Sequence, residues 1–267
     1  MTKRVISALV ALPLLFLAVL INKDIFFVSL VFLTLVGLHE YFAAVDNSGY
    51  KTIKVLGFSF GLALLLLVFL NGNLNFFALF ITIALISLYI TMVFNKKYNL
   101  FGVAATIVGI IYIPLFFSYL YLIRAIPDKG VYLIWFVFIL AFFTDTFAYF
   151  TGIAFGKTKL CPTVSPKKTV EGSIGGIIGA TVGTIVYGLI LNKIGIIDIS
   201  LIRLLLLGII GSVISQFGDL SASSIKRFVN IKDYGKIMPG HGGVLDRFDS
   251  IIFVAPLIYY YILYILL

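Results

Sequence analysis

The sequence predicts an all-α integral membrane protein of about nine transmembrane helices, with a polar cavity facing the cytosol in its C-terminal third. Of its 267 residues, 61% are hydrophobic and only 12% are charged, whereas soluble domains contain roughly 45–50% apolar residues. The mean hydropathy is +1.15. Nine apolar stretches also approach the ~20 residues that a helix needs to cross the hydrocarbon core of a bilayer. Together these observations exclude a soluble fold.

The nine expected spans follow one another with short connections. Their approximate ranges are 5–22, 25–45, 55–70, 76–95, 99–123, 131–155, 173–192, 201–222 and 250–267. Pro13, Pro114 and Pro256 fall inside spans, where neighbouring helices can satisfy the freed carbonyl groups, so we expect kinks there. No small-residue cleavage site precedes Ile25, and the first span is therefore interpreted as a retained anchor. We expect one polytopic domain over 1–267, with 1–123 mainly scaffold and 131–267 catalytic.

The distribution of Lys and Arg predicts the orientation in the membrane. With the N-terminus in the cytosol, fifteen of the twenty basic residues lie on the cytosolic side and five on the other side, as the positive-inside rule requires. We expect a multi-pass protein of the plasma membrane whose active site is cytoplasmic. The net charge of +9 follows from this bias and from attraction to anionic lipid. The basic residues are dispersed over short loops, so no nucleic-acid partner is expected.

The first five spans are mainly scaffold, and one acid stands out in each half of the chain. Glu40 lies at the cytoplasmic end of the second span, where a structural and a functional role are equally open. Asp145 lies about ten residues inside the sixth span. An Asp near the bilayer centre costs roughly 2.5–3.5 kcal/mol on insertion scales, so we expect a partner or a polar cavity around it.

The loop at 156–172 carries four lysines between the sixth and seventh spans. A positive loop ordinarily serves only as a topology determinant. The run from Ser165 to Thr169 also contains Lys167 and Lys168, and lysine is a good point-charge binder of phosphate. We favour substrate binding for these two residues. The lone Cys161 excludes an intramolecular disulfide and lacks the spacing of a metal site.

The seventh and eighth spans carry two different stripes. In the seventh, glycines recur at small-residue spacing, which allows close helix packing, against the active-site helices or against a second protomer. In the eighth, polar residues recur every three to four positions and form one stripe on an apolar helix. The members of that stripe are Ser212, Ser215, Gln216, Asp219, Ser223 and Lys226.

The segment 223–249 concentrates charge and glycine between two apolar runs. It contains five basic residues, three acids, His241 and four glycines. Asp246 and Asp249 are three residues apart, so in a helix both carboxylates share one face. Paired carboxylates suit magnesium, which takes phosphate oxygens as further ligands. The turn just before them, with Gly242 and Gly243, has little side-chain bulk and can bring backbone N–H groups close to an anion. The segment therefore predicts a phosphate site.

The order of residues in this segment resembles the signature of the phosphatidate cytidylyltransferase (CDP-diacylglycerol synthase) family. It runs through Ser223, Ile225, Lys226, Arg227, Lys232, Asp233, Pro239, Gly240, His241, Gly242, Gly243, Asp246, Arg247 and Asp249. The run Ser165 to Thr169, followed by Glu171 and Gly172, resembles a second element of the family. The resemblance implies a membrane enzyme that joins CTP to phosphatidate with magnesium and releases diphosphate.

Residue roles follow from the motif and the resemblance together. The expected catalytic residues are Asp219, Lys226, Asp246 and Asp249, and the three aspartates among them are the expected ligands of one or two cations, Mg²⁺ first. The expected substrate-binding residues are Lys167, Lys168, Ser223, Arg227, His241, Gly242, Gly243, Arg247 and Asp145. The resemblance and the glycines of the seventh span also suggest a homodimer.

Two other functions stay open at this point. An ion- or proton-coupled transporter would use Asp145 and Asp219 as ion sites, but it would leave the Lys/Gly/Asp segment unexplained. A lipid or polyprenol kinase would use similar phosphate chemistry. Its products, a phospholipid and a nucleoside diphosphate, differ from a CDP-lipid and diphosphate.

Overall fold

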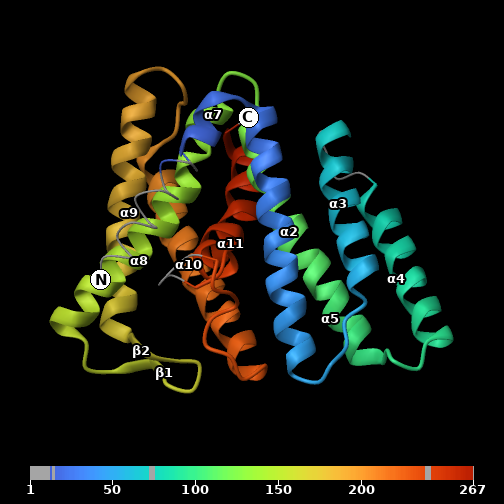
Figure 1. Cartoon of the computed structure of the whole chain (residues 1–267). Coiled ribbons are helices and arrows are strands. Elements are labelled where there is room, and N and C mark those ends of the chain that lie inside the picture. Colours follow the sequence, from blue (N-terminus) through green and yellow to red (C-terminus); the bar gives the residue numbers. More distant parts are fainter. Residues whose placement is uncertain (1–12, 14–15, 72–75, 238–241, 267) are drawn as a thin grey trace. The chain divides into compact units, whose positions relative to one another are not determined.

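The computed structural model describes residues 13, 16–71, 76–237 and 242–266 (Figure 1). These residues fall into two compact units. Unit 1 consists of residues 1–125 and 228–247, and unit 2 of residues 126–227 and 248–267. Residues 228–247, which belong to the predicted catalytic part 131–267, lie in the first unit.

Unit 1 is built from helices that begin with α2 (Lys23–Asn47), α3 (Lys54–Asn71) and α4 (Phe77–Phe94). A single helical run follows, consisting of α5 (Leu100–Ile110), the π-helical turn η1 (Ile111–Leu115) and α6 (Phe116–Arg124). Pro114 lies in η1, because a proline has no N–H to donate and the helix widens around it. The run nevertheless continues as one candidate span, Leu100–Arg124, so the proline causes an irregularity and not an end.

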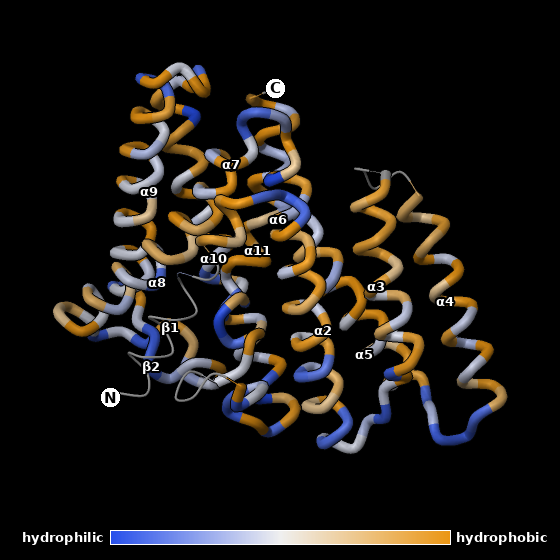
Figure 2. Tube along the Cα trace, turned by 45° about the horizontal axis from the view of Figure 1, so that its top comes forward, coloured by the Kyte–Doolittle hydropathy of each residue, from blue (hydrophilic) through white to orange (hydrophobic). Residues whose placement is uncertain are grey.

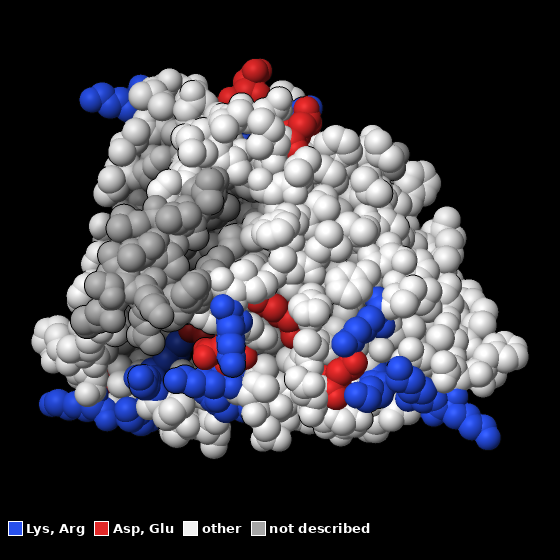
Figure 3. All heavy atoms as spheres, viewed as in Figure 1, with Lys and Arg blue, Asp and Glu red and all other residues white. Residues whose placement is uncertain are grey.

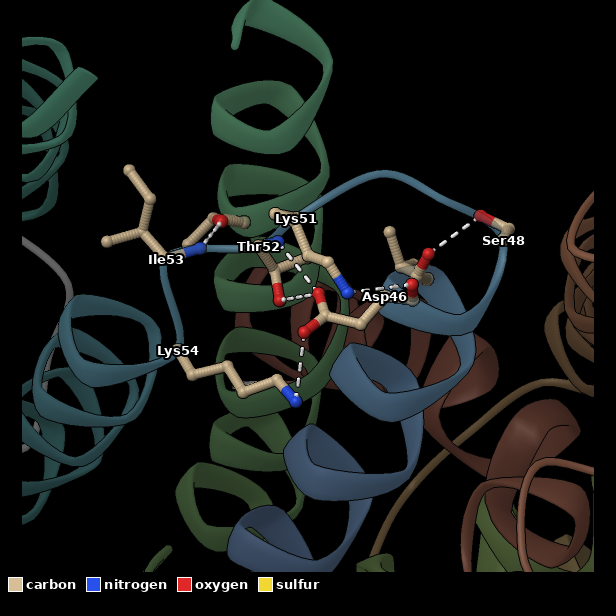
Figure 4. Close-up of polar contacts among 8 residues, drawn as sticks. Asp46, Ser48, Lys51, Thr52, Ile53 and Lys54 are labelled. Atoms are coloured by element: carbon tan, nitrogen blue, oxygen red, sulfur yellow. Dashed lines mark hydrogen bonds and ion pairs between the residues drawn. The ribbon is translucent and has the colours of Figure 1, made fainter. Parts of the chain in front are cut away.

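The connection between α2 and α3 is held by one acid (Figure 4). Asp46 Oδ1 accepts hydrogen bonds from the backbone N–H of Thr52 at 2.8 Å and from its hydroxyl at 2.7 Å. Asp46 Oδ2 lies 3.0 Å from Nζ of Lys54. The N–H of Ile53 donates to Oγ1 of Thr106 in α5 at 2.9 Å. These bonds satisfy the backbone groups that a helix end leaves open.

Unit 2 contains the short helix α7 (Gly130–Leu133), α8 (Trp135–Phe155), α9 (Val170–Lys193), α10 (Leu201–Phe228) and most of α11 (Leu245–Tyr261) with η2 (Ile262–Leu266). The glycine face expected in the seventh span lies against α8. A Cβ atom added at Gly179 would collide with the ring of Phe147, and one at Gly175 with Thr151. The close approach that these glycines allow is therefore used within the chain, between α8 and α9.

The lysine-rich loop contains a short hairpin that the sequence did not predict. Strands β1 (Lys159–Cys161) and β2 (Ser165–Thr169) pair antiparallel, with Lys159 opposite Thr169 and Cys161 opposite Ser165. Lysines and Pro166 do not favour a strand by propensity. Strands as short as these two are held by tertiary contacts instead. Thr169 then caps α9 by accepting from the N–H of Gly172 at 3.1 Å.

The fold class is confirmed: the chain is an all-α, multi-pass membrane protein apart from this hairpin. Seven helical runs in the described part of the chain are long and apolar enough to cross a bilayer, and Lys54–Leu70 is a shorter apolar helix. Figure 2 shows hydrophobic colour along α4 and hydrophilic colour in the turn that follows it, and most of the surface in Figure 3 carries no charged residue. The first expected span, 5–22, lies largely outside the described residues. The count of nine and the polar cavity stay predictions.

Candidate functional site

Three acids from three helices of unit 2 interact electrostatically. Asp249 of α11 is buried and feels the charges of Asp219 in α10 and Asp145 in α8, and also that of Lys226 in α10. Carboxylates removed from water need an opposite charge or hydrogen bonds to be tolerated. Asp145, the acid of the predicted sixth span, is itself exposed and lies close enough to act on the buried Asp249.

Both carboxylate oxygens of Asp219 have partners. Oδ2 of Asp219 lies 2.5 Å from Nζ of Lys168, and the hydroxyl of Ser223, one turn further along α10, donates to Oδ1 at 3.3 Å. Ser223 and Lys226 are buried on the same face of the helix. The polar stripe predicted in the eighth span therefore faces the protein interior, and its acid is paired with a lysine of the hairpin.

Two further contacts hold the hairpin and its base. Nε of Arg227 donates to the carbonyl oxygen of Val164, in the turn between β1 and β2, at 3.2 Å. The carboxylate of Glu171, in the first turn of α9, accepts from the N–H groups of Lys157 and Thr158 at 3.1 Å each. Lys167 and Lys168 thus lie on a fixed strand, with Lys167 exposed and Lys168 half-buried.

Gly242 and Gly243, the described part of the turn before α11 and from here on called the glycine turn, belong to unit 1, and Asp246 organises them. Oδ2 of Asp246 accepts from the N–H of Gly243 at 2.9 Å and from the N–H of Tyr234 at 2.8 Å. Gly242 has a φ of +87°, a conformation that strains other residues. A Cβ atom there would also lie 2.7 Å from Oδ2 of Asp246. The turn needs glycine at position 242 for both reasons.

Glu40 completes this arrangement in unit 1. It is buried in α2, and its two oxygens accept from the N–H groups of Val244 and Leu245 at 3.0 Å each. From the sequence the role of Glu40 is open, because an acid near an interface can simply reach water. Here it caps the start of α11 instead. The only feature of the sequence that pointed to a role for Glu40 was its position inside a predicted span.

The predicted site residues divide between the two units. Those in unit 2 are Asp145, Lys167, Lys168, Asp219, Ser223, Lys226, Arg227 and Asp249, and those in unit 1 are Gly242, Gly243, Asp246 and Arg247. His241 lies outside the described residues. Among the described residues, no three His, Cys, Asp or Glu side chains converge to hold a metal ion. The shared cation site of Asp219, Asp246 and Asp249 therefore stays a prediction.

The chemistry of the acids nevertheless fits a hard cation. Magnesium takes carboxylate oxygens and phosphate oxygens as ligands, and Asp219 and Asp249 supply carboxylates from neighbouring helices of one unit. Their mutual repulsion is offset in the structure by Lys168 and Lys226. A cluster that already requires positive charge is a suitable place for a divalent ion.

Comparisons with known proteins extend over nearly the whole chain. A family described as the cytidylyltransferase family matches residues 2–265. The chain is similar to a phosphatidate cytidylyltransferase of Staphylococcus haemolyticus, with 34% identity over 264 residues that cover 97% of each chain. It is 38% identical over 210 residues to the Bacillus subtilis protein of the same name, covering 75% of this chain and 76% of that one. A Staphylococcus saprophyticus relative, also so named, is 40% identical over 178 residues, 67% of this chain and 66% of the relative.

Proposed function

The chain belongs to the cytidylyltransferase family, and from this membership we propose that it converts CTP and phosphatidate into CDP-diacylglycerol and diphosphate. The family resemblance seen in the sequence is thereby confirmed. The observation that carries the proposal beyond the family name is the Lys168–Asp219 ion pair, beside Asp249 and Lys226, in a unit of apolar helices. Such a cluster suits a divalent cation, which in turn takes phosphate oxygens of a substrate as further ligands.

The reaction needs no nucleophilic side chain. A phosphate oxygen of phosphatidate attacks the α-phosphorus of CTP, a new P–O bond forms, and the bond from the α-phosphorus to the bridging oxygen breaks, so that diphosphate leaves. Transfers of this kind are catalysed mainly by positioning and by neutralising charge. In the proposal Lys226 and Arg227 stabilise the triphosphate, while Lys167, Lys168 and Arg247 bind phosphates of either substrate.

The remaining substrate contacts come from the turn and the helix faces. Gly242 and Gly243, with His241, are proposed to lie against a phosphate. The N–H of Gly243 is already donated to Asp246, so the donors proposed for the phosphate are the backbone N–H of Gly242 and the ring N–H of His241, while Gly243 leaves room for the anion. Ser223 and Asp145, both in unit 2, are proposed to contact substrate from α10 and α8. The lipid tails of phosphatidate would stay in the bilayer. The apolar helices of the protein already require that bilayer.

Magnesium is the proposed cofactor. Asp219, Asp246 and Asp249 would hold it, with room in principle for a second cation. When bound, the ion supplies positive charge that offsets the charge of the triphosphate and of the leaving diphosphate. The protein's own contribution is to orient the two substrates and to hold the acids in place.

Location and assembly are also proposals. The excess of basic residues on one side supports a cytoplasmic N-terminus and active site in the plasma membrane, where CTP is available. A homodimer rests on the family resemblance alone, because the glycines of α9 that suggested it contact α8 of the same chain.

One assay tests the proposal against its two rivals. Purified protein in detergent is mixed with labelled CTP, phosphatidate and magnesium, and the products are separated. We expect labelled CDP-diacylglycerol and diphosphate. A phosphorylated lipid with a nucleoside diphosphate would favour a kinase, and ion flux in proteoliposomes without nucleotide would favour a transporter.

A further inference from the structure

Glu40 makes a contact that joins two distant parts of the sequence within unit 1. Its Oε1 atom accepts from the N–H of Val244 and its Oε2 atom from the N–H of Leu245, each at 3.0 Å. The two oxygens of one carboxylate therefore accept hydrogen bonds from two consecutive backbone N–H groups. Glu40 itself is only 3% exposed.

The contact replaces a local helix cap. The first N–H groups of an α-helix have no partner in the helix, and a Ser, Thr, Asp or Asn at the cap position ordinarily accepts from them. The residue before α11 is Val244, whose side chain cannot accept. A carboxylate from another helix takes over this role, and the partial positive charge of the helix N-terminus favours it.

The same carboxylate lies close to two glycines of unit 1, Gly235 and Gly243. A Cβ atom added at Gly235 or at Gly243 would collide with the carboxylate of Glu40. One turn earlier on α2, a Cβ atom at Gly37 would lie 3.1 Å from the side chain of Leu245. One face of α2 thus lies against Gly235, Gly243 and the start of α11.

We propose that Glu40 is a positioning residue for the reaction, which holds the glycine turn and Asp246 in the arrangement that binds substrate phosphate. This inference rests on the proposed function. Asp246 accepts from the N–H of Gly243, and Glu40 accepts from the next two N–H groups along the chain. Three successive N–H groups are therefore held by two carboxylates, so the shape of the turn depends on both acids.

The expected effect of losing Glu40 follows from this arrangement. Without its carboxylate the turn samples other shapes, and only a fraction of the molecules is ready to bind. The apparent dissociation constant then rises by the inverse of that fraction. Because Glu40 accepts its hydrogen bonds from backbone N–H groups and contacts no reacting atom in the proposal, saturating substrate restores most of the turnover.

The test is the Glu40→Gln variant in full-length protein. Glutamine has the same size, but its NH₂ group cannot accept, so one of the two N–H groups loses its partner. We expect the KM for CTP to rise about tenfold, while kcat per folded molecule changes by less than about threefold. Hydrogen exchange at the amides of Val244 and Leu245 becomes faster than in the unmodified protein.

Asp46→Asn is the matched control. Asp46 lies on the same helix and also accepts from a backbone N–H, that of Thr52, but it holds the α2–α3 connection. We expect this variant to lower the melting temperature and to leave the KM for CTP unchanged. A purely structural role for Glu40 would give the same result for Glu40→Gln, with a lower melting temperature and an unchanged KM, and would overturn the inference.

A second variant covers the case in which Glu40→Gln does not fold. Gly235→Ala keeps the carboxylate but pushes it away from its partners, so the KM for CTP should rise as well. In the double variant the two effects should not add, because both act on one contact. An unchanged KM in Gly235→Ala would refute the inference. If the unmodified protein makes no CDP-diacylglycerol, the proposed function itself fails.

Discussion

The Nζ atom of Lys168 on strand β2 lies 2.5 Å from the Oδ2 atom of Asp219 on helix α10. Both side chains are about one-quarter exposed, so water weakens the pair less than it would on an open surface. The lysine is on a hairpin that Arg227 also contacts, through the carbonyl oxygen of Val164. The hairpin therefore supplies positive charge to a helix whose polar face is buried.

This pair predicts different roles for two adjacent lysines. Lys168→Gln should lower kcat/KM by about a hundredfold, because it removes the charge that offsets Asp219 as well as a phosphate contact. Lys167→Gln should raise the KM by a smaller factor, because exposed Lys167 loses a phosphate contact alone. Steady-state kinetics with varied CTP and phosphatidate measure both effects.

Lys159→Gln is the control for the hairpin. Lys159 is exposed on β1 and opposite Thr169, and no role in binding is proposed for it. Near-normal kinetics are expected for this variant. If all three glutamine variants showed equal kinetics, the lysines of the hairpin would act only as topology determinants and not in substrate binding.

The second prediction concerns the three aspartates. Asp219→Asn, Asp246→Asn and Asp249→Asn should each lower turnover by at least about a hundredfold, since asparagine keeps the size but not the charge that a divalent ion requires. The magnesium concentration for half-maximal activity should rise most for Asp246→Asn. Activity titrated against magnesium is the measurement.

Asp198→Asn serves as the control here, because Asp198 is exposed between α9 and α10 and is outside the proposed site. Its magnesium dependence should match that of the unmodified protein. Near-normal activity of Asp246→Asn at ordinary magnesium would mean that any metal is held elsewhere.

The third prediction concerns topology. In a Cys161→Ser background, a cysteine introduced at Lys23 should react with an impermeant reagent in intact cells, and one introduced at Lys236 should react only after permeabilisation. Both positions are exposed in the structure. Position 235 is unsuitable, because any side chain there would meet Glu40. Equal labelling of the two cysteines would contradict the predicted orientation.

The fourth prediction concerns the packing of α8 and α9. Gly179→Val should destabilise the protein by about 1–3 kcal/mol, because its side chain has to displace the ring of Phe147. Thermal unfolding in detergent measures the change. Val182→Ala, at an exposed position of α9, should leave the melting temperature nearly unchanged, and an equal loss in both variants would show that the glycine face is not packed tightly.

The helices and much of the site chemistry could be predicted from the sequence for a simple reason. A segment that crosses a bilayer must be apolar along its length and must satisfy its own backbone. The spans at 25–45, 76–95, 99–123, 131–155, 173–192, 201–222 and 250–267 therefore each correspond to a helical run. The polar stripe of α10 and the acids Asp145, Asp219 and Asp249 are conspicuous for the same reason, because charge in an apolar run is costly.

Only the tertiary structure decided which groups meet. Neither the pairing of Lys168 with Asp219 nor the hydrogen bonds from Glu40 to residues 244 and 245 have a local sequence signal, because each joins residues far apart in the chain. From the sequence, the glycines of α9 could have packed against another protomer. In the structure they pack against α8 of the same chain. Composition and periodicity determine which segments enter the membrane and which face is polar, whereas partners depend on how those faces pack in three dimensions.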